Sequence, residues 1–124
     1  MIGIDIISIP RMKKFYKKHG IKGYNKFLRK EEIELTRSPK TAAGFWCLKE
    51  ATSKALGCGI GKTCSFYDIW IHKNKLGKPY ITLSKHLIEK FGIKNIDASI
   101  SHDGNFAIGV VNILGSKTKV DLSH

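Results

Sequence analysis

The sequence predicts an α+β fold in which an antiparallel sheet packs on a long central helix. Three observations lead to this prediction: apolar stretches at strand spacing near both ends of the chain, one long stretch at helical spacing, and glycine-rich turns between the elements. The expected order, β-α-α-α-β-β-α-β-β, is typical of the α+β class with antiparallel strands.

The first half of the chain is expected to form one strand and three helices. Met1 to Ile9 is rich in isoleucine, which predicts a largely buried strand. Arg11 to His19 predicts a short basic helix that ends at Gly20. Apolar and charged residues then alternate at helical spacing from Tyr24 to Leu35. The long helix is expected to begin near Pro39 and to end near Leu56.

The second half of the chain is expected to hold four strands and a short helix. The expected strands are Phe66–His72, Pro79–Leu83, Ile96–Ser101 and Phe106–Leu114. Asn74–Lys78 predicts a hairpin turn between the first two strands, and Ser84 is expected to cap a helix that ends near Phe91. Gly57–Gly61 is unable to continue a helix and predicts a flexible loop. The last ten residues predict a frayed polar tail.

The charge of the chain is its unusual compositional feature. The 124 residues include 22 Lys+Arg against 10 Asp+Glu, a formal net charge of +12 at pH 7. The length is typical of one domain and no shift in composition marks a second, so residues 1–124 are expected to form a single domain. The charge predicts an anionic partner: nucleic acid, an anionic membrane, a phosphorylated small molecule or an acidic protein.

The sequence argues against a membrane-spanning protein and against a secreted one. No apolar run approaches the roughly 18 residues of a transmembrane helix, and the N-terminus has no basic leader and carries Asp5 within its first apolar stretch. A cytoplasmic protein is therefore expected. Cys47, Cys58 and Cys64 match no zinc or CxxC spacing, so we expect reduced thiols and no catalytic cysteine.

Asp5 is the first candidate for function. A carboxylate within an apolar strand is costly to bury, so it needs a cation, a metal ion or several hydrogen-bond donors. The alternative is that Asp5 lies on an edge strand and faces solvent.

The long helix carries the second candidate. Glu50, Ser53, Lys54 and Gly57 share one helical face, which leads directly into a glycine-rich stretch that ends at Lys62. This set suits a metal-bound diphosphate: a carboxylate for Mg²⁺, an ammonium for a phosphate oxygen, and a loop whose N–H groups a phosphate could approach. The alternative is a Glu50–Lys54 ion pair on a solvated face, which contributes only a few tenths of a kcal/mol.

The third candidate is the end of a late strand. Alternation places Ser99 and Ser101 on one face with His102 at the strand end. Adjacent strand residues point to opposite faces, so Ser101 and His102 do not form a nucleophile–base pair. The alternative is a histidine that is hydrogen-bonded or exposed and has no catalytic role.

Together these segments resemble the holo-acyl-carrier-protein synthase family of 4′-phosphopantetheinyl transferases. Four blocks carry the resemblance, in order, over most of residues 1–114. They are Gly3-Ile4-Asp5 followed by Arg11; Trp46 through Lys49-Glu50-Ala51, Lys54-Ala55 and Gly57 to Gly59-Ile60-Gly61; Gly77-Lys78-Pro79-Tyr80; and Ser99-Ile100-Ser101-His102.

The resemblance implies the fold of that family and its reaction, the Mg²⁺-dependent transfer of 4′-phosphopantetheine from coenzyme A to a serine of an apo acyl-carrier protein. Adenosine 3′,5′-bisphosphate is released, and the setting is fatty acid biosynthesis. By the resemblance, Asp5 and Glu50 are the metal ligands, and Lys54 contacts the diphosphate and assists the departing phosphate. The base that takes the serine proton is either Glu50 or a metal-bound hydroxide oriented by it.

The resemblance also assigns binding residues and an assembly. The residues expected to bind coenzyme A are Ser53, Lys54, Gly57, Gly59, Gly61, Lys62, Pro79 and His102. Arg11, with Lys14 and Lys18, is expected to face the acidic carrier protein, where charge speeds encounter. Small members of the family form homotrimers with each site between neighbouring subunits. Two features depart from the pattern: the arginine that usually opens the helix block is missing, and Gly20 to Pro39 matches no motif.

A small basic nucleic-acid-binding module is the alternative function. Its support is the net charge and a cluster of basic residues, Arg11, Lys13, Lys14, Lys17, Lys18 and Lys22. The aromatic residues, however, lie mostly in apolar helix or strand positions and not among these basic residues, as base stacking would require. We therefore expect no nucleic-acid partner. Stable membrane insertion is not expected either, because only Met12, Phe15 and Tyr16 could insert.

Overall fold

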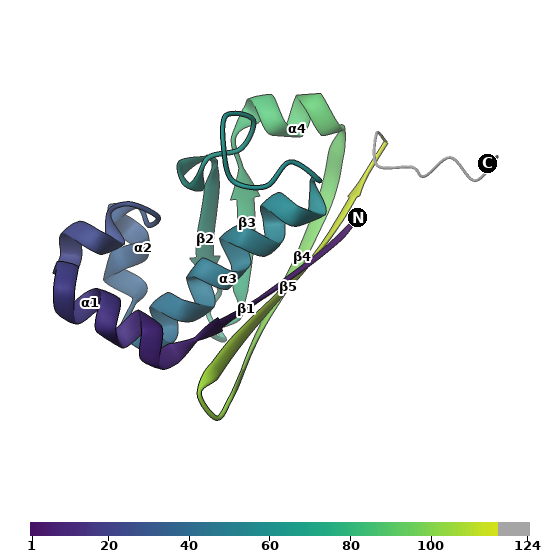
Figure 1. The fold of residues 1–124 in the computed structure, drawn as a ribbon. Helices are drawn as coiled ribbons and strands as arrows, with labels where there is room; N and C mark the ends of the chain where they lie inside the picture. Colours follow the sequence, from purple (N-terminus) through teal and green to yellow (C-terminus); the bar gives the residue numbers. More distant parts are fainter. Residues whose placement is uncertain (117–124) are drawn as a thin grey trace.

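The structure, a computed structural model, describes residues 1–116 (Figure 1). From residue 117 on, the predicted polar tail lies outside the described residues. The elements in chain order are β1 (Ile2–Ser8), α1 (Ile9–Tyr24), α2 (Lys30–Leu35), α3 (Pro39–Ala55), the 3₁₀ turn η1 (Phe66–Asp68), β2 (Ile69–Lys73), β3 (Pro79–Leu83), α4 (Lys85–Phe91), β4 (Ile93–Asp103) and β5 (Phe106–Gly115). None of the described helices is both long and apolar enough to cross a bilayer.

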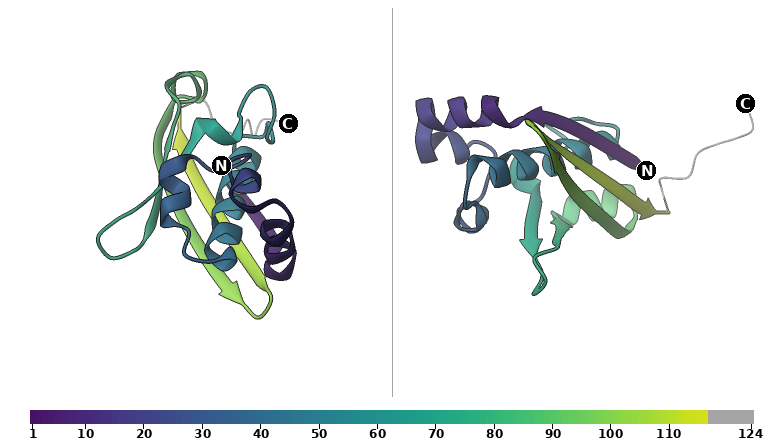
Figure 2. Two further views of the ribbon diagram at one scale, coloured as in Figure 1. Left: turned by 90° about the vertical axis from the view of Figure 1, so that its left-hand side faces the viewer. Right: turned by 90° about the horizontal axis from the view of Figure 1, so that it is seen from below.

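The strands form two antiparallel sheets with α3 between them. The larger sheet has the order β1-β5-β4 and the smaller one pairs β2 with β3. α1 and α2 lie toward the N-terminal end of α3 (Figures 1 and 2). The predicted α+β class, with an antiparallel sheet packed on a long central helix, is therefore confirmed.

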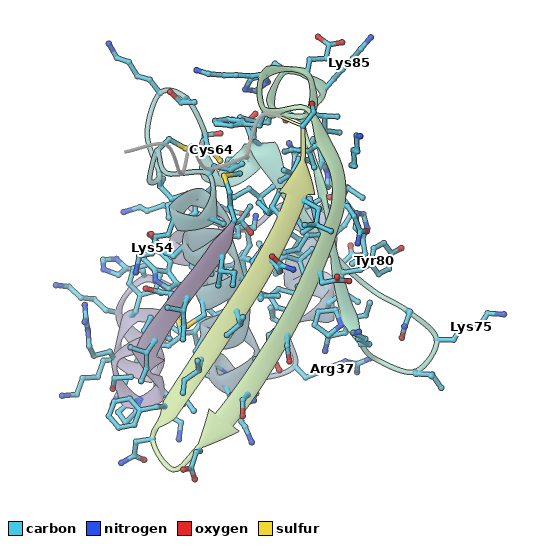
Figure 3. The ribbon with its side chains drawn as sticks, turned by 90° about the vertical axis from the view of Figure 1, so that its right-hand side faces the viewer. Arg37, Lys54, Cys64, Lys75, Tyr80 and Lys85 are labelled. Atoms are coloured by element: carbon cyan, nitrogen blue, oxygen red, sulfur yellow. The ribbon has the colours of Figure 1, made fainter. Side chains whose placement is uncertain are left out.

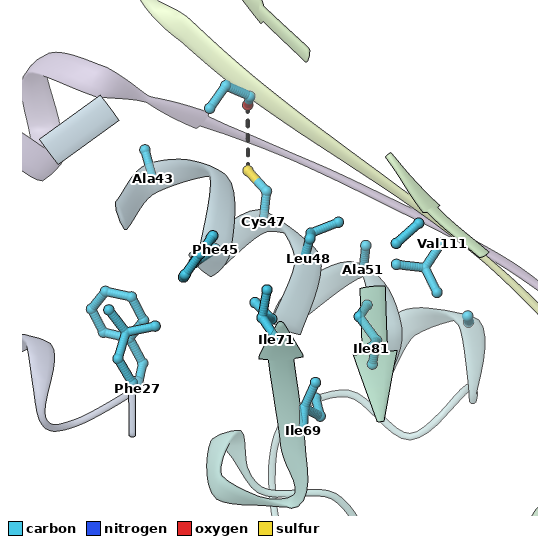
Figure 4. Close-up of a cluster of buried hydrophobic side chains, with 14 of the residues drawn as sticks. Phe27, Ala43, Phe45, Cys47, Leu48, Ala51, Ile69, Ile71, Ile81 and Val111 are labelled. Atoms are coloured by element: carbon cyan, nitrogen blue, oxygen red, sulfur yellow. Dashed lines mark hydrogen bonds between the residues drawn. The ribbon is translucent and has the colours of Figure 1, made fainter. Parts of the chain in front are cut away.

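The core lies on both sides of α3. The helix buries small and apolar side chains against the larger sheet and against the β2–β3 hairpin (Figure 4). The buried members of this cluster include Phe27, Ala43, Phe45, Cys47, Leu48, Ala51, Ile69, Ile71, Ile81 and Val111. A helix that is apolar on two opposite sides is expected where an element is covered by two layers.

Two glycines let α3 approach the larger sheet at backbone distance. A Cβ on Gly3 of β1 would lie 1.8 Å from the carbonyl oxygen of Ala51, and one on Gly109 of β5 would lie 2.9 Å from the carbonyl carbon of Cys47. No side chain fits at either position without moving the helix. The sheet register places Asp5 directly opposite Gly109, so the same contact brings Asp5 close to α3.

The prediction of a largely buried first strand is wrong. The side chains of Ile2, Ile4 and Ile6 are 74%, 58% and 57% exposed, whereas Gly3 is buried and the side chain of Asp5 is 14% exposed. β1 is an edge strand that α3 covers on one face only, and alternation then turns the three isoleucines outward.

The prediction of one helix from Tyr24 to Leu35 is also wrong. α1 continues to Tyr24, although Gly20, with φ of 61°, breaks its helical geometry where the sequence predicts the helix end. α2 begins only at Lys30, and its first turn is closed by Glu32, whose carboxylate accepts a hydrogen bond from the Arg29 backbone N–H at 2.6 Å.

The other elements agree with the predictions in kind. The long helix begins after Ser38, whose hydroxyl accepts a hydrogen bond from Thr41 N, and ends at Ala55. The hairpin turn joins β2 to β3, and α4 follows Ser84. Residues 66–68 form η1 and not the start of a strand, and β4 begins three residues earlier than expected, at Ile93.

A buried ion pair anchors the segment that matched no motif. Lys49 Nζ lies 2.7 Å from Glu32 Oε1, and both side chains are at most 1% exposed. Glu32 Oε2 also accepts the Ile71 backbone N–H at 2.8 Å, and Lys49 donates to the Phe66 carbonyl at 3.1 Å. One carboxylate therefore links α2, α3 and β2.

We expect Gly3→Ala to destabilise the fold by about 3 kcal/mol, the upper range for overpacking, because the new methyl group meets the α3 backbone. Gly61→Ala is the matched control, since a Cβ there meets nothing within 4 Å and Gly61 is not in the left-handed region. Denaturant unfolding of both variants checks this expectation. Equal stability of the two variants would contradict the close contact.

Candidate functional site

Asp5, Glu50 and Lys54 come together where β1 crosses the second half of α3. Lys54 Nζ lies 2.7 Å from Asp5 Oδ1 and 3.4 Å from the Ile4 carbonyl oxygen. Asp5 faces the helix and not solvent, so the solvent-facing alternative is wrong. Among the described residues, the ion pair of Lys54 is with Asp5 and not the intrahelical pair with Glu50.

The cluster carries more negative than positive charge. Burial, and then the charge of Asp5, raises the pKa of Glu50, while Lys54 opposes the shift. The hydrogen bond to Asp5 raises the pKa of Lys54. Two carboxylates thus share one ammonium group, and a second cation would relieve their repulsion.

This donor set fits a small hard cation. Carboxylate oxygens are the ligands that Mg²⁺ prefers, and Mg²⁺ is often held by one or two carboxylates together with water and substrate phosphates. In the described part of the chain, no group of three or more His, Cys, Asp or Glu side chains could hold a metal ion. A cation at Asp5 and Glu50 would therefore take its remaining ligands from water or substrate.

Cys47 lies beside this cluster, a contact that the sequence analysis missed. Its thiol donates to the Ala107 carbonyl oxygen at 3.3 Å (Figure 4). Burial, followed by the charge of Asp5 and a hydrogen bond with it, raises the pKa of Cys47 to about 12. A buried protonated thiol is a poor nucleophile. The sequence spacing indicates this contact, because Cys47 lies one helical turn before Glu50 and so on the same side of the helix.

The glycine-rich loop has open space around its glycines, but most of their backbone N–H groups already donate hydrogen bonds. Gly57 and Gly59 have φ of 80° and 64°, and a Cβ at either position would meet nothing within 4 Å. However, the N–H of Gly57 donates to Lys54 O, that of Gly59 to Ser53 O, and that of Gly61 to Cys64 O. These three N–H groups thus have backbone acceptors in the structure, and their contact with a phosphate stays a prediction. What the loop offers is space and the exposed side chain of Lys62.

Ser53 differs from its predicted neighbours on the helix face. It is fully buried, and its hydroxyl donates to the Glu50 carbonyl oxygen at 2.7 Å. Its own carbonyl oxygen accepts the N–H groups of Cys58 and Gly59. In the structure Ser53 therefore holds the start of the loop against α3.

Pro79 and His102 lie together in a second location. With Thr41, Phe45, Lys73, Gly77 and Ile100 they line a cavity of about 210 Å³. His102 is exposed and its Nε2 lies 3.2 Å from the Lys40 carbonyl oxygen. Its role in binding coenzyme A stays a prediction. Lys73, which the sequence analysis missed, places its Nζ 5.7 Å from the Phe45 ring centroid.

In one chain the two locations lie at different points along α3 and toward opposite edges of the larger sheet. A Cβ on Gly44 would lie 3.5 Å from His102 Nε2, and Lys54 is ten positions further along α3, about 15 Å away at the helical rise. β5 separates β1 from β4. In Figure 3, Lys54 lies beyond the β1 edge of the larger sheet, and Tyr80, next to Pro79, lies beyond the β4 edge.

Two exposed surfaces complete the description. Arg11, Lys14 and Lys18 are exposed on α1. Arg11 also borders an apolar cavity of about 220 Å³, which the sequence analysis missed and which Ile7, Met12, Phe15, Phe27 and Trp46 line. On the outer face of the larger sheet, exposed apolar side chains run over β1 and β5: Ile2, Ile4, Ile6, Phe106, Val110 and Leu114.

Comparisons with known proteins agree on one family. The family profile described as the 4′-phosphopantetheinyl transferase superfamily matches residues 1–111. The chain is 57% identical over 118 residues to a holo-[acyl-carrier-protein] synthase of Aliarcobacter butzleri, covering 94% of this chain and all of that protein.

Solved structures agree with the sequence relatives. The crystal structure of the Helicobacter pylori holo-[acyl-carrier-protein] synthase in complex with coenzyme A is similar with a TM-score of 0.88 and 50% identity, covering 92% of this chain and all of that one. A Bacillus anthracis holo-(acyl-carrier-protein) synthase in complex with CoA (3′,5′-ADP) is similar with a TM-score of 0.78 and 34% identity, covering 93% of this chain and 96% of that one.

The raised pKa of Glu50 predicts a pH-dependent effect on stability. A carboxyl whose pKa is higher in the folded than in the unfolded chain stabilises the fold fully only below its unfolded pKa, and this stabilisation is lost as pH rises through the folded pKa. Glu50→Gln lacks that ionisation. In metal-free buffer we expect the variant to gain stability relative to the parent chain as pH is raised from about 4 to about 7.

Urea unfolding at several pH values with a chelator present measures this difference. Glu31→Gln, at an exposed position of α2, is the matched control and should show no comparable trend. A Glu50→Gln difference that stays constant with pH would rule out a raised pKa at this position.

Proposed function

Because this chain belongs to the 4′-phosphopantetheinyl transferase superfamily, we propose that it transfers 4′-phosphopantetheine from coenzyme A to a serine of an apo acyl-carrier protein, releasing adenosine 3′,5′-bisphosphate. Within this chain, the main support for the proposal is that Asp5, Glu50 and Lys54 lie close together at the β1–α3 contact. Residues 1–124 would act as one transferase domain, in a cytoplasmic setting where fatty acid biosynthesis uses the modified carrier.

We propose that Asp5 and Glu50 hold Mg²⁺. Their oxygens suit that ion. After burial, the charge of Asp5 is the second cause that raises the pKa of Glu50, and Mg²⁺ would relieve this repulsion. When bound, Mg²⁺ would polarise the diphosphate and stabilise charge that develops on the leaving group. Lys54, whose side chain is 51% exposed, can turn from Asp5 toward a phosphate oxygen and neutralise it.

Glu50 is also the proposed acceptor of the serine proton. Phosphoryl-type transfer requires in-line positioning and charge neutralisation more than a protein nucleophile, since the carrier supplies its own hydroxyl. A general base works best when its pKa approaches the operating pH. In the metal-free chain burial, and then Asp5, raises the pKa of Glu50, and a bound Mg²⁺ would oppose that shift.

Coenzyme A would be bound between two copies of the chain. The cavity at Pro79 and His102 lies toward the β4 margin of the larger sheet, and Asp5 and Lys54 lie at the β1 margin. A neighbouring copy would bring its own cavity to the Asp5–Lys54 margin. The exposed apolar face of β1 and β5 is suited to the contact that would bring them together. A contact between copies through this face fits the homotrimer, with sites between neighbouring subunits, that the family resemblance implies.

Basic side chains outside the cluster have separate proposed partners. Lys62, on the open loop, would serve the coenzyme A phosphates with Lys54. Lys73 is the proposed replacement for the arginine that is missing from the helix block, because it lies beside Phe45 in the Pro79–His102 cavity. The α1 surface with Arg11, Lys14 and Lys18 would face the acidic carrier protein.

The direct test incubates the protein with coenzyme A, Mg²⁺ and an apo acyl-carrier protein. We expect the carrier to gain the intact mass of one phosphopantetheine group and the gain to require the metal. A carrier that a control transferase modifies, but this protein does not, would overturn the proposal. Nucleic-acid binding that is steeply salt-dependent and that excess coenzyme A does not relieve would favour the alternative function.

We expect Asp5→Asn and Glu50→Gln each to lower the Mg²⁺-dependent rate by about a hundredfold or more, as for the loss of a metal ligand or a general base. Glu31→Gln is the matched control and should keep the parent rate. Circular dichroism spectra and unfolding curves of the variants, compared with those of the parent chain, check that the variants fold. Near-parent rates for both site variants would refute the metal assignment.

A further inference from the structure

The carboxylate of Asp68 ties the end of the loop that carries Lys62 to the start of α4. Asp68 Oδ2 accepts the Ser65 backbone N–H at 2.8 Å and the Ser65 hydroxyl at 3.1 Å. Asp68 Oδ1 accepts the Ser84 hydroxyl at 2.8 Å. The Asp68 carbonyl oxygen also accepts the Ser84 N–H at 2.9 Å. One residue of η1 therefore holds together two segments that are distant in sequence.

His86 makes a second connection between α4 and the same loop. Its Nε2 lies 3.3 Å from the Thr63 carbonyl oxygen and 3.8 Å from Asp68 Oδ2. Because a carbonyl oxygen can only accept, Nε2 carries a proton in this contact. Thr63 directly follows Lys62 in the chain, and Figure 1 shows the loop and α4 at the same end of the molecule. The backbone next to Lys62 is thus attached to α4.

The loop, residues 57–65, is held at both ends and has more freedom between them. At its start, the N–H groups of Cys58 and Gly59 donate to the Ser53 carbonyl oxygen. In its middle, a Cβ at Gly59 or Gly61 would meet nothing within 4 Å. Lys62 is exposed, and no described residue forms an ion pair with it. Its position therefore depends on the two attached ends of the loop.

We propose that Asp68 is a positioning residue for coenzyme A: together with Ser84 and His86 it holds the loop so that Lys62 reaches a phosphate group of that ligand. The inference rests on the proposed function, because it assumes that the loop serves the coenzyme A phosphates. Asp68 acts through the backbone at Ser65 and needs no contact with the ligand.

The charge of Asp68 makes this role distinguishable from a purely electrostatic one. Burial by itself would raise the pKa of Asp68, but the hydrogen bonds from Ser65 and Ser84, and then the charge of His86, lower it below its ordinary value. Asp68 is therefore an anion at neutral pH. Coenzyme A is an anion too, so removal of this charge would favour its binding by electrostatics. Loss of positioning has the opposite effect.

Loss of the Asp68 bonds weakens binding because it changes the population of loop positions. A loop without its attachment to α4 spends part of its time where Lys62 does not reach the phosphate. The apparent affinity then falls in proportion to the fraction of chains that are competent to bind. A competent fraction of about one tenth corresponds to a tenfold weaker affinity.

The first experiment measures Asp68→Asn with coenzyme A by calorimetry and by steady-state kinetics. Asparagine has one acceptor oxygen in place of two, so it cannot accept from both Ser65 and Ser84. We expect the Kd and the KM for coenzyme A to rise about tenfold. The kcat and the KM for the carrier should stay within about twofold, since only ligand binding changes. Unchanged or tighter binding of coenzyme A would overturn the positioning role.

A second variant keeps the charge of Asp68 and removes one of its bonds. Ser84→Ala should weaken coenzyme A binding in the same direction, and it provides the test if Asp68→Asn does not fold. Glu31→Gln, which removes a carboxylate at an exposed position of α2, is the matched control and should keep the parent affinity. Denaturant unfolding of each variant checks that the binding measurements are made on folded protein.

A double-mutant cycle with Lys62→Ala separates positioning from a general structural role. If Asp68 acts through Lys62, the loss of affinity in Asp68→Asn should be much smaller in a chain that already lacks the Lys62 side chain. Additive losses would overturn the proposal. If the parent chain shows the expected cycle but transfers nothing to a carrier, the proposed function fails while the positioning role stands. If the parent transfers the group and Asp68→Asn binds coenzyme A as the parent does, the positioning role fails while the function stands.

Discussion

The contact between α3 and the larger sheet is the constraint on which the rest of the structure depends. Gly3 and Gly109 allow the helix backbone to touch the strands, where any side chain would hold it away. That distance decides the site, because Asp5 lies two positions after Gly3 and is opposite Gly109. With a wider spacing, the Asp5 carboxylate would lose Lys54 and would no longer act on the pKa of Glu50. The close packing of α3 on the sheet therefore also determines the charge interactions of Asp5.

The cluster at this contact holds two carboxylates and one ammonium group, and the proposed Mg²⁺ would supply the missing positive charge. A half-buried glutamate beside an aspartate, with one lysine between them, is not a stabilising arrangement in itself. Natural sites often retain such strain where a ligand relieves it. Here the missing positive charge would arrive with the reaction components, which makes binding more favourable than it would be at a relaxed, internally neutral pair.

The sequence predicted those features whose signals are local. Pro39 and Gly57 mark the ends of α3 through chain stiffness and backbone freedom, and these signals need no knowledge of the neighbouring elements. The orientation of β1 was not predictable in this way, because an alternating pattern of glycine, aspartate and isoleucine does not say which face a helix will cover. The partner of Lys54 was missed for the same reason: Asp5 is distant in sequence, and Glu50 is one helical turn away. Spacing placed Glu50 and Lys54 on one helical face, and only the family resemblance joined Asp5 to them. The position of His102 relative to this set depends on the order of strands in the sheet.

The carboxylate of Glu32 has a consequence for how the molecule opens. α2 spans six residues, too few for a helix to be stable alone, and its anchors are contributed by Lys49 of α3 and Ile71 of β2. It can therefore dock only after α3 and the hairpin are in place. Loss of any one bond to Glu32 leaves a buried charge unsatisfied, so these bonds break together. Residues 29–35, which these bonds hold, are therefore expected to open as a unit. Their amide protons would exchange with solvent at a shared rate, faster than those of α3 and below the free energy of global unfolding.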